Sequence, residues 1–501
     1  MALVRLRDNR FMEHGLRFAK KADDCSTFVS SHDDIEGLGG QEVNDLERDL
    51  LKRFGGKKLA DIPNEANENL VLLDETHVAD SERMAMPFFS FKEESDGGPF
   101  KLETNNLMGV LRFRDKKSDA SVQVEVLSRF DKGEKNYFLN YLLSKVFDCA
   151  LGAEAVSAEQ SALLDILLDI VFVRRLGEAA KAGLLRHYRE FRNNDWNFKG
   201  RLDLSRHIRE NVPLQHGIAY VKREIDFDVP VNRMILLAAL AVRRRHPTFF
   251  EGNPDAADAL RQLRMDVTEE HDLRMLLSRR DCREPVRHPF FREIWEPLRQ
   301  IARMILEDEH WTLFNEATDD EEVSGVVFDG SWLWEEYIAK VLKPDFLHCG
   351  RSETADGQGL RVFAGGYARF YPDFLKKDRS CVLDAKYKRS NPNGGRDDVH
   401  QVLCYLLLTG AKLGGLVFPP ADEECEGAEA VHAEENGGET VRNGGWSEAK
   451  RIESPYSTDA SPVFWRCFSW KKIDTDNWSV FCDEMKKQEE ALRRRAVADP
   501  S

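Results

Sequence analysis

The chain has 501 residues, of which 42% are hydrophobic and 32% charged, and its formal net charge is −16. This length exceeds that of one ordinary domain and the apolar content allows sizeable cores, so two to four domains of about 150 residues each are expected. The apolar stretches are too short and too amphipathic for a membrane span, and the N-terminus lacks an apolar signal region. The nine cysteines are scattered and do not have the spacing of a zinc site. A cytoplasmic protein with reduced thiols is therefore predicted.

The N-terminal region, residues 1–135, is predicted to contain β-structure. A short amphipathic helix bounded by glycines is expected within residues 39–56. Two strands with a polar turn between them are expected within residues 105–131. In the second of them, Val122, Val124 and Val126 alternate with polar residues, which predicts a half-buried strand.

Residues 136–320 are predicted to form a mostly helical middle domain. Apolar residues recur at i, i+3 and i+4 within residues 136–151 and 161–191, which predicts a helix over each range. Residues 220–245 indicate a basic strand followed by a helix, and residues 291–309 indicate a further helix.

Residues 321–501 are predicted to form a small mixed sheet with helices packed against it. The prediction depends on the order of the elements: a helix, a tight β-hairpin, a second helix, two strands and a final helix. They are expected at residues 328–346, 370–390, 397–411, 414–419, 462–470 and 477–495. The whole chain is therefore expected to be a multidomain α+β or α/β protein.

Three charged residues of the expected hairpin indicate metal-dependent chemistry. Asp384 and Lys386 are two positions apart on one strand, so their side chains point to the same face, whereas Ala385 points to the other. Asp373 lies on the partner strand. Two carboxylates that converge from adjacent strands form the hard oxygen site that Mg²⁺ prefers. A lysine beside them can position a water molecule or stabilise the charge on a phosphate, which predicts phosphodiester hydrolysis.

The helices on either side of the hairpin carry further polar residues. Glu335 lies on an otherwise apolar and aromatic helix, where an inward-facing carboxylate needs a partner such as a metal ion. Gln401 and Tyr405 are four residues apart on the following helix and share a face. They are predicted to contact the substrate backbone and to hold Lys386 in line.

Each of these features taken singly also has an ordinary structural explanation. Asp384 and Lys386 can form a surface pair, Glu335 can be solvated together with Glu336, and Gln401 and Tyr405 can be ordinary helix residues. A second Pro-Asp pair at residues 344–345 ends a helix and has no Asp-x-Lys after it, so it is set aside. The conjunction of all the features, in this order, favours a catalytic site.

Charge is distributed unevenly over the C-terminal third. Residues 421–448 contain nine acidic residues and one arginine in a Gly-rich stretch, which predicts a flexible solvated loop. Residues 361–415 contain ten Lys and Arg residues against five Asp residues. The region of the hairpin is therefore locally basic, as a phosphate-binding surface requires, although the whole chain is acidic.

The series Glu335, Pro372–Asp373, Asp384–Ala385–Lys386 and Gln401–Tyr405 resembles the PD-(D/E)xK nucleases that carry a QxxxY extension. Longer stretches within residues 105–420 resemble the McrC family, the nuclease subunits of McrBC-type 5-methylcytosine restriction systems. They include "FKGRLDLSRHIREN", "IAYVKREIDFDVPVNRMIL" and "FDGSWLWEEYIAKVL". One departure lies after the second expected strand, where "VLSRFDKGEKN" places Arg129 and Lys132 in a segment that often ends in Pro-Lys in the family.

The resemblance implies a restriction-endonuclease-like fold for residues 321–501 and a role for each site residue. Asp373, Asp384 and the Ala385 carbonyl would bind Mg²⁺, for which Mn²⁺ substitutes. Lys386 would orient the attacking water. Glu335 would be the acid that the helix contributes to the catalytic and metal site, with Glu336 as its rival.

The resemblance also implies the partners. The chain would be the endonuclease subunit of a modification-dependent (type IV) defence system that cuts modified double-stranded DNA. Residues 1–135 and 136–320 would bind and stimulate a McrB-like AAA+ GTPase hexamer. The chain contains no GxxxxGK[ST] motif, so this motor would be a separate polypeptide. The alternative is a non-catalytic regulator that activates the motor through a retained nuclease fold; the intact pair of acids and lysine favours the nuclease.

The acidic segment gives a first testable prediction. Removing the negative charge of residues 421–448 should raise nonspecific DNA affinity at low salt, because the segment repels the phosphate backbone, and the difference should shrink as salt screens it. Fluorescence anisotropy with a DNA duplex at several salt concentrations measures this. A variant of unchanged length with Gln and Asn in place of the acids separates charge from length. Equal affinity at every salt concentration would show that the segment is only an insertion.

Overall fold

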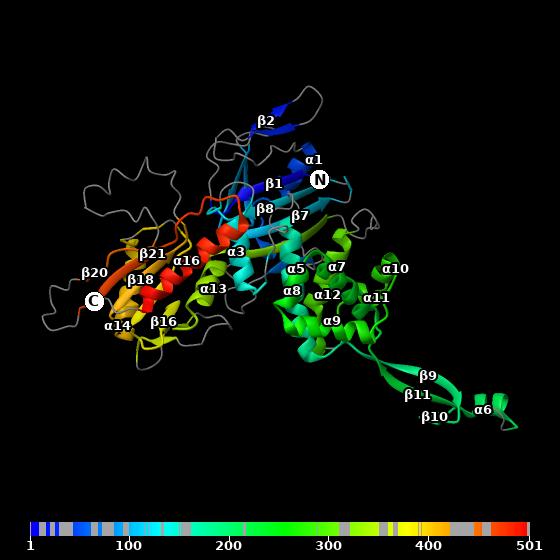
Figure 1. Cartoon of the computed structure of the whole chain (residues 1–501). Coiled ribbons are helices and arrows are strands. Elements are labelled where there is room, and N and C mark those ends of the chain that lie inside the picture. The colour runs from blue at the N-terminus through cyan, green and yellow to red at the C-terminus, as the bar shows by residue number, and fades with distance from the viewer. Residues whose placement is uncertain are drawn as a thin grey trace. The chain divides into compact units, whose positions relative to one another are not determined.

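The computed structural model describes the chain in segments and shows two compact units (Figure 1). The first unit comprises Met1–Leu164 and Ala317–Ser501, and the second comprises Asp165–Glu316. The described residues are 2–9, 17–20, 26–29, 44–61, 69–72, 85–93, 100–115, 117–118, 120–131, 135–149, 151, 162–213, 217–287, 289–309, 321–349, 359–363, 369–388, 390–391, 393–420, 445–452 and 462–497.

A five-stranded sheet forms the N-terminal part of the first unit. Its strands are arranged in the order β1 (Ala2–Arg7), β8 (Ala120–Leu127), β7 (Leu107–Asp115), β12 (Glu321–Asp329) and β4 (Asn69–Leu72). The pairs β1–β8 and β12–β4 are parallel, and the pairs β7–β8 and β7–β12 are antiparallel. β12 therefore follows the second unit in the sequence but pairs with strands that precede that unit.

The two strands expected within residues 105–131 are β7 and β8, but the prediction that the second of them is half-buried is wrong. Its polar residues Gln123 and Glu125 are as deeply buried as the valines between them. They are accommodated because they bond to each other, and because Arg5 donates to Glu125 over 2.9 Å. A buried polar group is tolerated where it has hydrogen-bond partners.

Smaller elements surround this sheet. The helix expected within residues 39–56 is α1 (Asp45–Phe54), which begins in a capping box between Asn44 and Glu47. The remaining elements of this part are β2 (Arg17–Lys20), β3 (Ser26–Val29), the 3₁₀ helix η2 (Leu59–Asp61), β5 (Phe89–Glu93) and β6 (Phe100–Thr104).

A mixed sheet forms the C-terminal part of the first unit. Its order is β13 (Phe346–His348), β16 (Phe374–Lys376), β17 (Cys381–Ala385), β18 (Leu413–Phe418), β21 (Phe464–Ser469) and β19 (Gly445–Trp446), and β20 (Lys450–Arg451) also pairs with β21. β16 and β17 form the expected antiparallel hairpin, whereas β17, β18 and β21 run parallel. A short pair, β14 (Leu360–Arg361) and β15 (Arg369–Phe370), lies apart from it.

Helices pack on this second sheet as the sequence predicts. α14 (Arg396–Thr409) connects β17 to β18, and α13 (Gly330–Leu342) follows β12 directly. α3 (Tyr137–Val146), α13 and α16 (Trp478–Val497) meet around the buried carboxylate of Glu489, which accepts hydrogen bonds from Tyr141 at 2.8 Å and Tyr337 at 3.1 Å. The N-terminal and C-terminal parts of the unit thus share a core.

Most of the acidic segment 421–448 lies outside the described residues, but its end does not. Gly445–Trp446 is strand β19, and Trp446 is buried, so a solvated loop up to residue 448 is a wrong prediction for this end. Substitutions that remove the charge of the segment should therefore leave these last residues intact.

The second unit is a helical domain with a β-arm. Its helices are α5 (Ala162–Ala182), α7 (Pro230–Arg245), α8 (Pro247–Glu251), α9 (Pro254–Asp266), α10 (Leu273–Ser278), α11 (Arg280–Arg283) and α12 (Pro289–Glu309). Nowhere in the described segments is a helix both long and apolar enough to cross a membrane.

The arm corrects the sequence prediction of one helix over residues 161–191. The helix ends at Ala182, where Gly183 adopts a φ of +83°, a value that glycine adopts without strain. β9 (His187–Asp195) then pairs antiparallel with β11 (Ile218–Asp226), and β10 (Arg201–Leu202) and α6 (Leu204–Asn211) lie at the far end of the arm (Figure 1). The alternation of polar and aromatic residues in "HYREFRNND" is the strand pattern that this prediction overlooked.

The arm is fixed at its base and carries exposed apolar side chains among its charged ones. The Asn232 amide on α7 donates to the carbonyls of Leu185 and Phe227, one at the foot of each strand, and both distances are 2.8 Å. Large apolar side chains are exposed on the arm: Tyr188, Trp196, Phe198, Leu202, Leu204, Ile208, Val212 and Ile225. Exposed apolar residues gathered on one element indicate a protein-binding surface.

Candidate active site at the β16–β17 hairpin

The hairpin brings Asp373, Asp384 and Lys386 together. Asp373 directly precedes β16, Asp384 lies in β17, and Lys386 directly follows β17. Within the turn, the Asp378 carboxylate accepts hydrogen bonds from the amide and hydroxyl of Ser380, which fixes the reversal of the chain. The register pairs Phe374 with Leu383, so the two acids lie at the same end of the hairpin.

One of the two carboxyl groups is buried, the other is half-buried, and the two repel each other. Asp384 is 1% exposed. Burial raises the pKa of Asp384 to about 6, although Lys386 counteracts the shift. Loss of hydration also raises the pKa of Asp373 well above its ordinary value, and repulsion from Asp384 and Glu335 adds to the shift. Such a pair favours a bound cation, which relieves the repulsion.

Lys386 and the α14 side chains form one connected network. The Lys386 ammonium lies 2.6 Å from Asp384 Oδ2 and donates to Gln401 Oε1 over 2.8 Å. The Gln401 amide donates to Asp384 Oδ1 at 3.2 Å and to the Tyr405 hydroxyl at 2.8 Å, and Tyr405 donates to the carbonyl of Tyr371. Gln401 therefore contacts Lys386 and Asp384 directly, and Tyr405 contacts Gln401.

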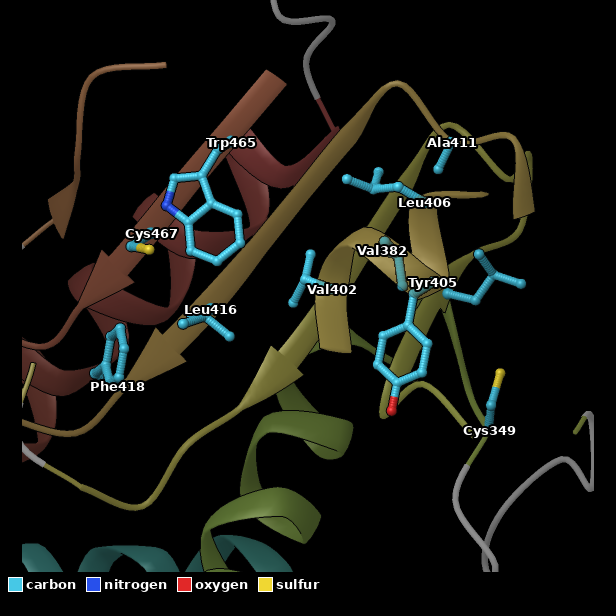
Figure 2. Packing of buried hydrophobic residues seen from close by; sticks show 11 residues of the cluster. Cys349, Val382, Val402, Tyr405, Leu406, Ala411, Leu416, Phe418, Trp465 and Cys467 are labelled. Carbon is cyan, nitrogen blue, oxygen red and sulfur yellow. The ribbon is translucent and has the colours of Figure 1, made fainter. Parts of the chain in front are cut away.

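The apolar core beneath α14 fixes this helix. Tyr405 belongs to a buried cluster that also contains Val382 of β17, Val402 and Leu416, and Figure 2 shows these side chains packed between α14 and the sheet. Because the Tyr405 ring is part of the core while its hydroxyl bonds to Gln401, packing on one side determines the position of the polar network on the other.

Glu335, and not Glu336, is the helix acid that faces the two aspartates. The Glu335 charge raises the pKa of both Asp373 and Asp384, although less than burial does. Its carboxylate lies 2.8 Å from Nε2 of His348, whose ring stacks on Phe374. Glu336 is buried on α13.

Sequence reasoning missed two residues of this site. His348 ends the three-residue strand β13, which is too short to show an alternating pattern. Asp398 at the start of α14 pairs with Lys388 at 2.6 Å and lies 4.0 Å from the Lys386 ammonium. An acid in the first turn of a helix is so common that it gives no functional signal.

The donors at the hairpin fit a hard divalent cation. Asp384 Oδ2 is buried and lies 2.6 Å from the Lys386 ammonium, and the oxygen donors of the site are the two carboxylates and the Ala385 carbonyl. In the part of the chain that is described, however, no three His, Cys, Asp or Glu side chains are arranged as a ready metal cluster. Glu335 instead contacts His348, and Asp373 accepts the Ala385 amide at 2.7 Å. The fit therefore depends on the two aspartates and the Ala385 carbonyl.

A family model described as "McrBC 5-methylcytosine restriction system component" matches residues 102–419 of the chain. The chain belongs to this family. The match includes the arm, α13, the hairpin and α14, and so contains every residue of the candidate site.

Two solved structures from Thermococcus gammatolerans are similar to this McrBC family member. One is a half-complex from a tetradecameric assembly of McrB AAA+ hexamers with bound McrC, with 14% identity, a TM-score of 0.44, and coverage of 97% of this chain and 99% of that one. The other is a McrBC complex with 14% identity, a TM-score of 0.29, and coverage of 68% and 87%. No curated protein matches this chain.

Calorimetric titration with Mg²⁺ tests the hairpin as a metal site. We expect Asp384→Asn to abolish binding, because it removes one of the two charged ligands. In the unsubstituted chain the affinity should rise as the pH increases through about 6, because Asp384 must lose its proton to bind a cation.

The matched control is Asp378→Asn in the turn of the same hairpin, which should bind Mg²⁺ normally. Mn²⁺ should bind as well, since the site offers hard oxygen ligands. Unchanged Mg²⁺ binding by the Asp384→Asn variant would exclude this site.

Proposed function

We propose that the chain is the Mg²⁺-dependent DNA endonuclease subunit of a modification-dependent, McrBC-type restriction system. The observation that carries the proposal is the network in which Lys386 is held between the buried Asp384 and Gln401 beside a second, half-buried aspartate. A lysine that only neutralised Asp384 would not need the Gln401 side chain to orient it, so the hydrogen bond to Gln401 supports a catalytic role for Lys386. The mixed sheet with α13 and α14 against it is consistent with the PD-(D/E)xK fold.

Each side chain has a role that follows from its position. Asp373, Asp384 and the Ala385 carbonyl would hold Mg²⁺, with Mn²⁺ as a substitute, and the bound cation would supply Lewis-acid activation of the scissile phosphate. The Lys386 ammonium is placed to orient a water molecule beside that phosphate. Gln401 fixes the direction of the ammonium, and Tyr405 fixes Gln401. Glu335, bonded to His348, adds negative charge at the edge of the site.

The proposed partners are modified double-stranded DNA and a McrB-like AAA+ GTPase hexamer that the chain stimulates. The chain contains no phosphate-binding GxxxxGK[ST] motif of its own. The arm of the second unit offers an apolar surface for a protein partner. Cys149, Cys282, Cys381, Cys404 and Cys482 are free thiols, which fits the reducing cytoplasm proposed for the chain.

A non-catalytic regulator is the alternative function. The observation that favours it is that the three acids are not arranged as a ready metal cluster among the described residues. In that case the nuclease fold would serve only to activate the motor, and the chain would not cut DNA.

Lys386→Ala separates the two functions. Together with the partner GTPase, this variant should hydrolyse GTP at the normal rate but lose DNA cleavage by roughly a hundredfold or more, because an oriented cation at the reacting phosphate is lost. The variant should also be less stable than the unsubstituted chain, because Lys386 pairs with the buried Asp384 carboxylate, so thermal unfolding is measured to show that it is folded at the assay temperature. Cleavage of methylated plasmid and GTP hydrolysis are measured side by side.

The control is Lys377→Ala, which removes an exposed lysine of the same hairpin that donates to the Pro344 carbonyl and not to the network. It should cleave at a rate close to that of the unsubstituted chain. A regulator would cut no DNA with or without Lys386. Normal cleavage by both Lys386→Ala and Asp373→Ala would show that the hairpin is an ordinary surface element.

The arm gives a second prediction. Leu204 and Ile208 lie one turn apart on α6 and are 58% and 56% exposed. Ile208→Asp should weaken binding of the GTPase roughly tenfold, because it places a charge in an apolar contact. GTPase stimulation should fall in parallel, and Mg²⁺ binding should stay unchanged. Met265→Asp on α9, where the side chain is 82% exposed, is the control. If both variants stimulate the motor equally, the arm is not the contact.

A further inference from the structure

Arg129, which the sequence shows as a departure from the family pattern, lies in the turn after β8 and is only 9% exposed. Its backbone amide donates to Asp8 Oδ1 at 2.6 Å, and its guanidinium contacts Asp8 Oδ2 at 3.2 Å. The same guanidinium donates to the carbonyl of Tyr387 at 2.5 Å. Arg129 therefore connects the end of β1 to the residue that follows Lys386 in the sequence.

Residues 128–130 also hold the Tyr387 side chain. The Tyr387 hydroxyl lies 2.9 Å from Ser128 Oγ, and its ring packs edge-on against Phe130 with 4.9 Å between the ring centroids. The Arg129 guanidinium lies over the same ring, 4.9 Å from its centroid. The backbone, the ring and the hydroxyl of Tyr387 are thus all fixed by one turn of the N-terminal sheet.

The contact between Arg129 and Tyr387 lies directly after the end of β17, where the hydrogen bonds of the sheet end. The last parallel-sheet contact of this segment is the Lys386 amide, which donates to the Val417 carbonyl at 2.9 Å. The next residue has its carbonyl bonded to Arg129 instead of to a strand. The main chain at Lys386 is therefore held on one side by the C-terminal sheet and on the other by Arg129. A lysine side chain can point steadily at Asp384 and Gln401 only if its main chain is fixed.

A buried ion pair usually adds little to the stability of a fold. A role in positioning a neighbouring residue therefore explains Asp8 and Arg129 better than a role in stability does. Asp8 is 0% exposed, and burial raises its pKa to about 6 while Arg129 counteracts the shift. Replacing such a pair with apolar residues is often neutral or stabilising, because removing two charges from water costs about as much as their attraction returns. The pair is, however, specific in geometry, since one guanidinium serves a carboxylate and a carbonyl at the same time.

We propose that Arg129, held by Asp8, is a positioning residue for Lys386. It fixes Tyr387 and thereby the direction of the lysine beside Asp384, so the N-terminal sheet completes the site of the C-terminal sheet. This inference rests on the proposed nuclease function, in which Lys386 acts at the scissile phosphate.

Arg5 and Glu125 provide a matched comparison. They form an ion pair of 2.9 Å between β1 and β8 of the same sheet, and their side chains are 11% and 2% exposed. The pair resembles Asp8–Arg129 in burial and location but joins only strands of the N-terminal sheet. Arg5→Ala therefore reports what loss of a buried arginine in this sheet does without loss of the contact to Tyr387.

The experiment compares full-length chains carrying Arg129→Ala, Arg129→Lys and Arg5→Ala, each assembled with the partner GTPase. The rate of cleavage of methylated plasmid is measured in a single turnover at saturating Mg²⁺. Arg129→Ala should lower this rate roughly 10- to 100-fold, as loss of a residue that orients a metal-site group does. Arg5→Ala should change it less than twofold. Arg129→Lys should recover only part of the rate, since an ammonium cannot reproduce the guanidinium fork.

Hydrogen exchange of the free chain supplies a readout that does not depend on cleavage. Arg129→Ala should speed exchange of the Lys386 and Tyr387 amides several-fold, whereas Arg5→Ala should leave them as they are and speed exchange only within β1 and β8. Thermal unfolding of each variant shows whether Arg129→Ala and Arg5→Ala lower the stability of the chain by similar amounts. Where Arg129→Ala does not fold, Arg129→Lys and Asp8→Asn carry the same comparison.

Equal slowing by Arg129→Ala and Arg5→Ala, or unchanged exchange at Lys386 in Arg129→Ala, would overturn the positioning role. Failure of the proposed function gives a different result. Either the unsubstituted chain would not cleave DNA, or the Lys386→Ala variant would cleave DNA as fast as the unsubstituted chain. The exchange measurement would then still decide whether Arg129 orders the segment after β17.

Discussion

The placement of two carboxyl groups, the half-buried Asp373 and the buried Asp384, at one end of a short hairpin is the constraint on which the site depends. Two negative charges placed close together and out of water repel each other, and the free energy of that repulsion has to be offset by nearby positive charge. Lys386 provides one such charge from within the chain. The arrangement of α14 follows from this requirement, because Gln401 links the lysine and Asp384 to the core through Tyr405.

The C-terminal part of the fold could be predicted in detail from the sequence. α14, β18, β21 and α16 begin and end within two residues of the positions expected for them, and α13 and the hairpin lie inside the longer ranges expected for them. These elements are local, have clear periodicity, and end at glycines or polar turns. The residues Glu335, Gln401 and Tyr405 could be placed beside the hairpin for the same reason, since spacing along a helix determines which side chains share a face.

The features that could not be predicted all depend on contacts between distant parts of the chain. β12 completes a sheet whose other strands lie some 200 or more residues earlier, as the pairing of Val327 with Gly109 shows. Arg129 and His348 gain significance only from Tyr387 and Glu335, which are far away in the sequence. The arm was misread as helix because "LGEAAKAGLLRHYREF" continues a helical composition past the glycine that ends α5.

The order of the strands in the N-terminal sheet has a consequence for synthesis of the chain. β4 joins the sheet through β12, so residues 69–72 wait for a partner until residues 321–329 have left the ribosome. At about 5–20 residues per second the delay is on the order of tens of seconds, long enough for the intervening helical unit to fold first. During that time β7 presents an open edge, a surface that attracts other strands. A nascent chain of this protein is therefore most exposed to aggregation just before β12 emerges, and a chaperone that shields strand edges would act at that stage.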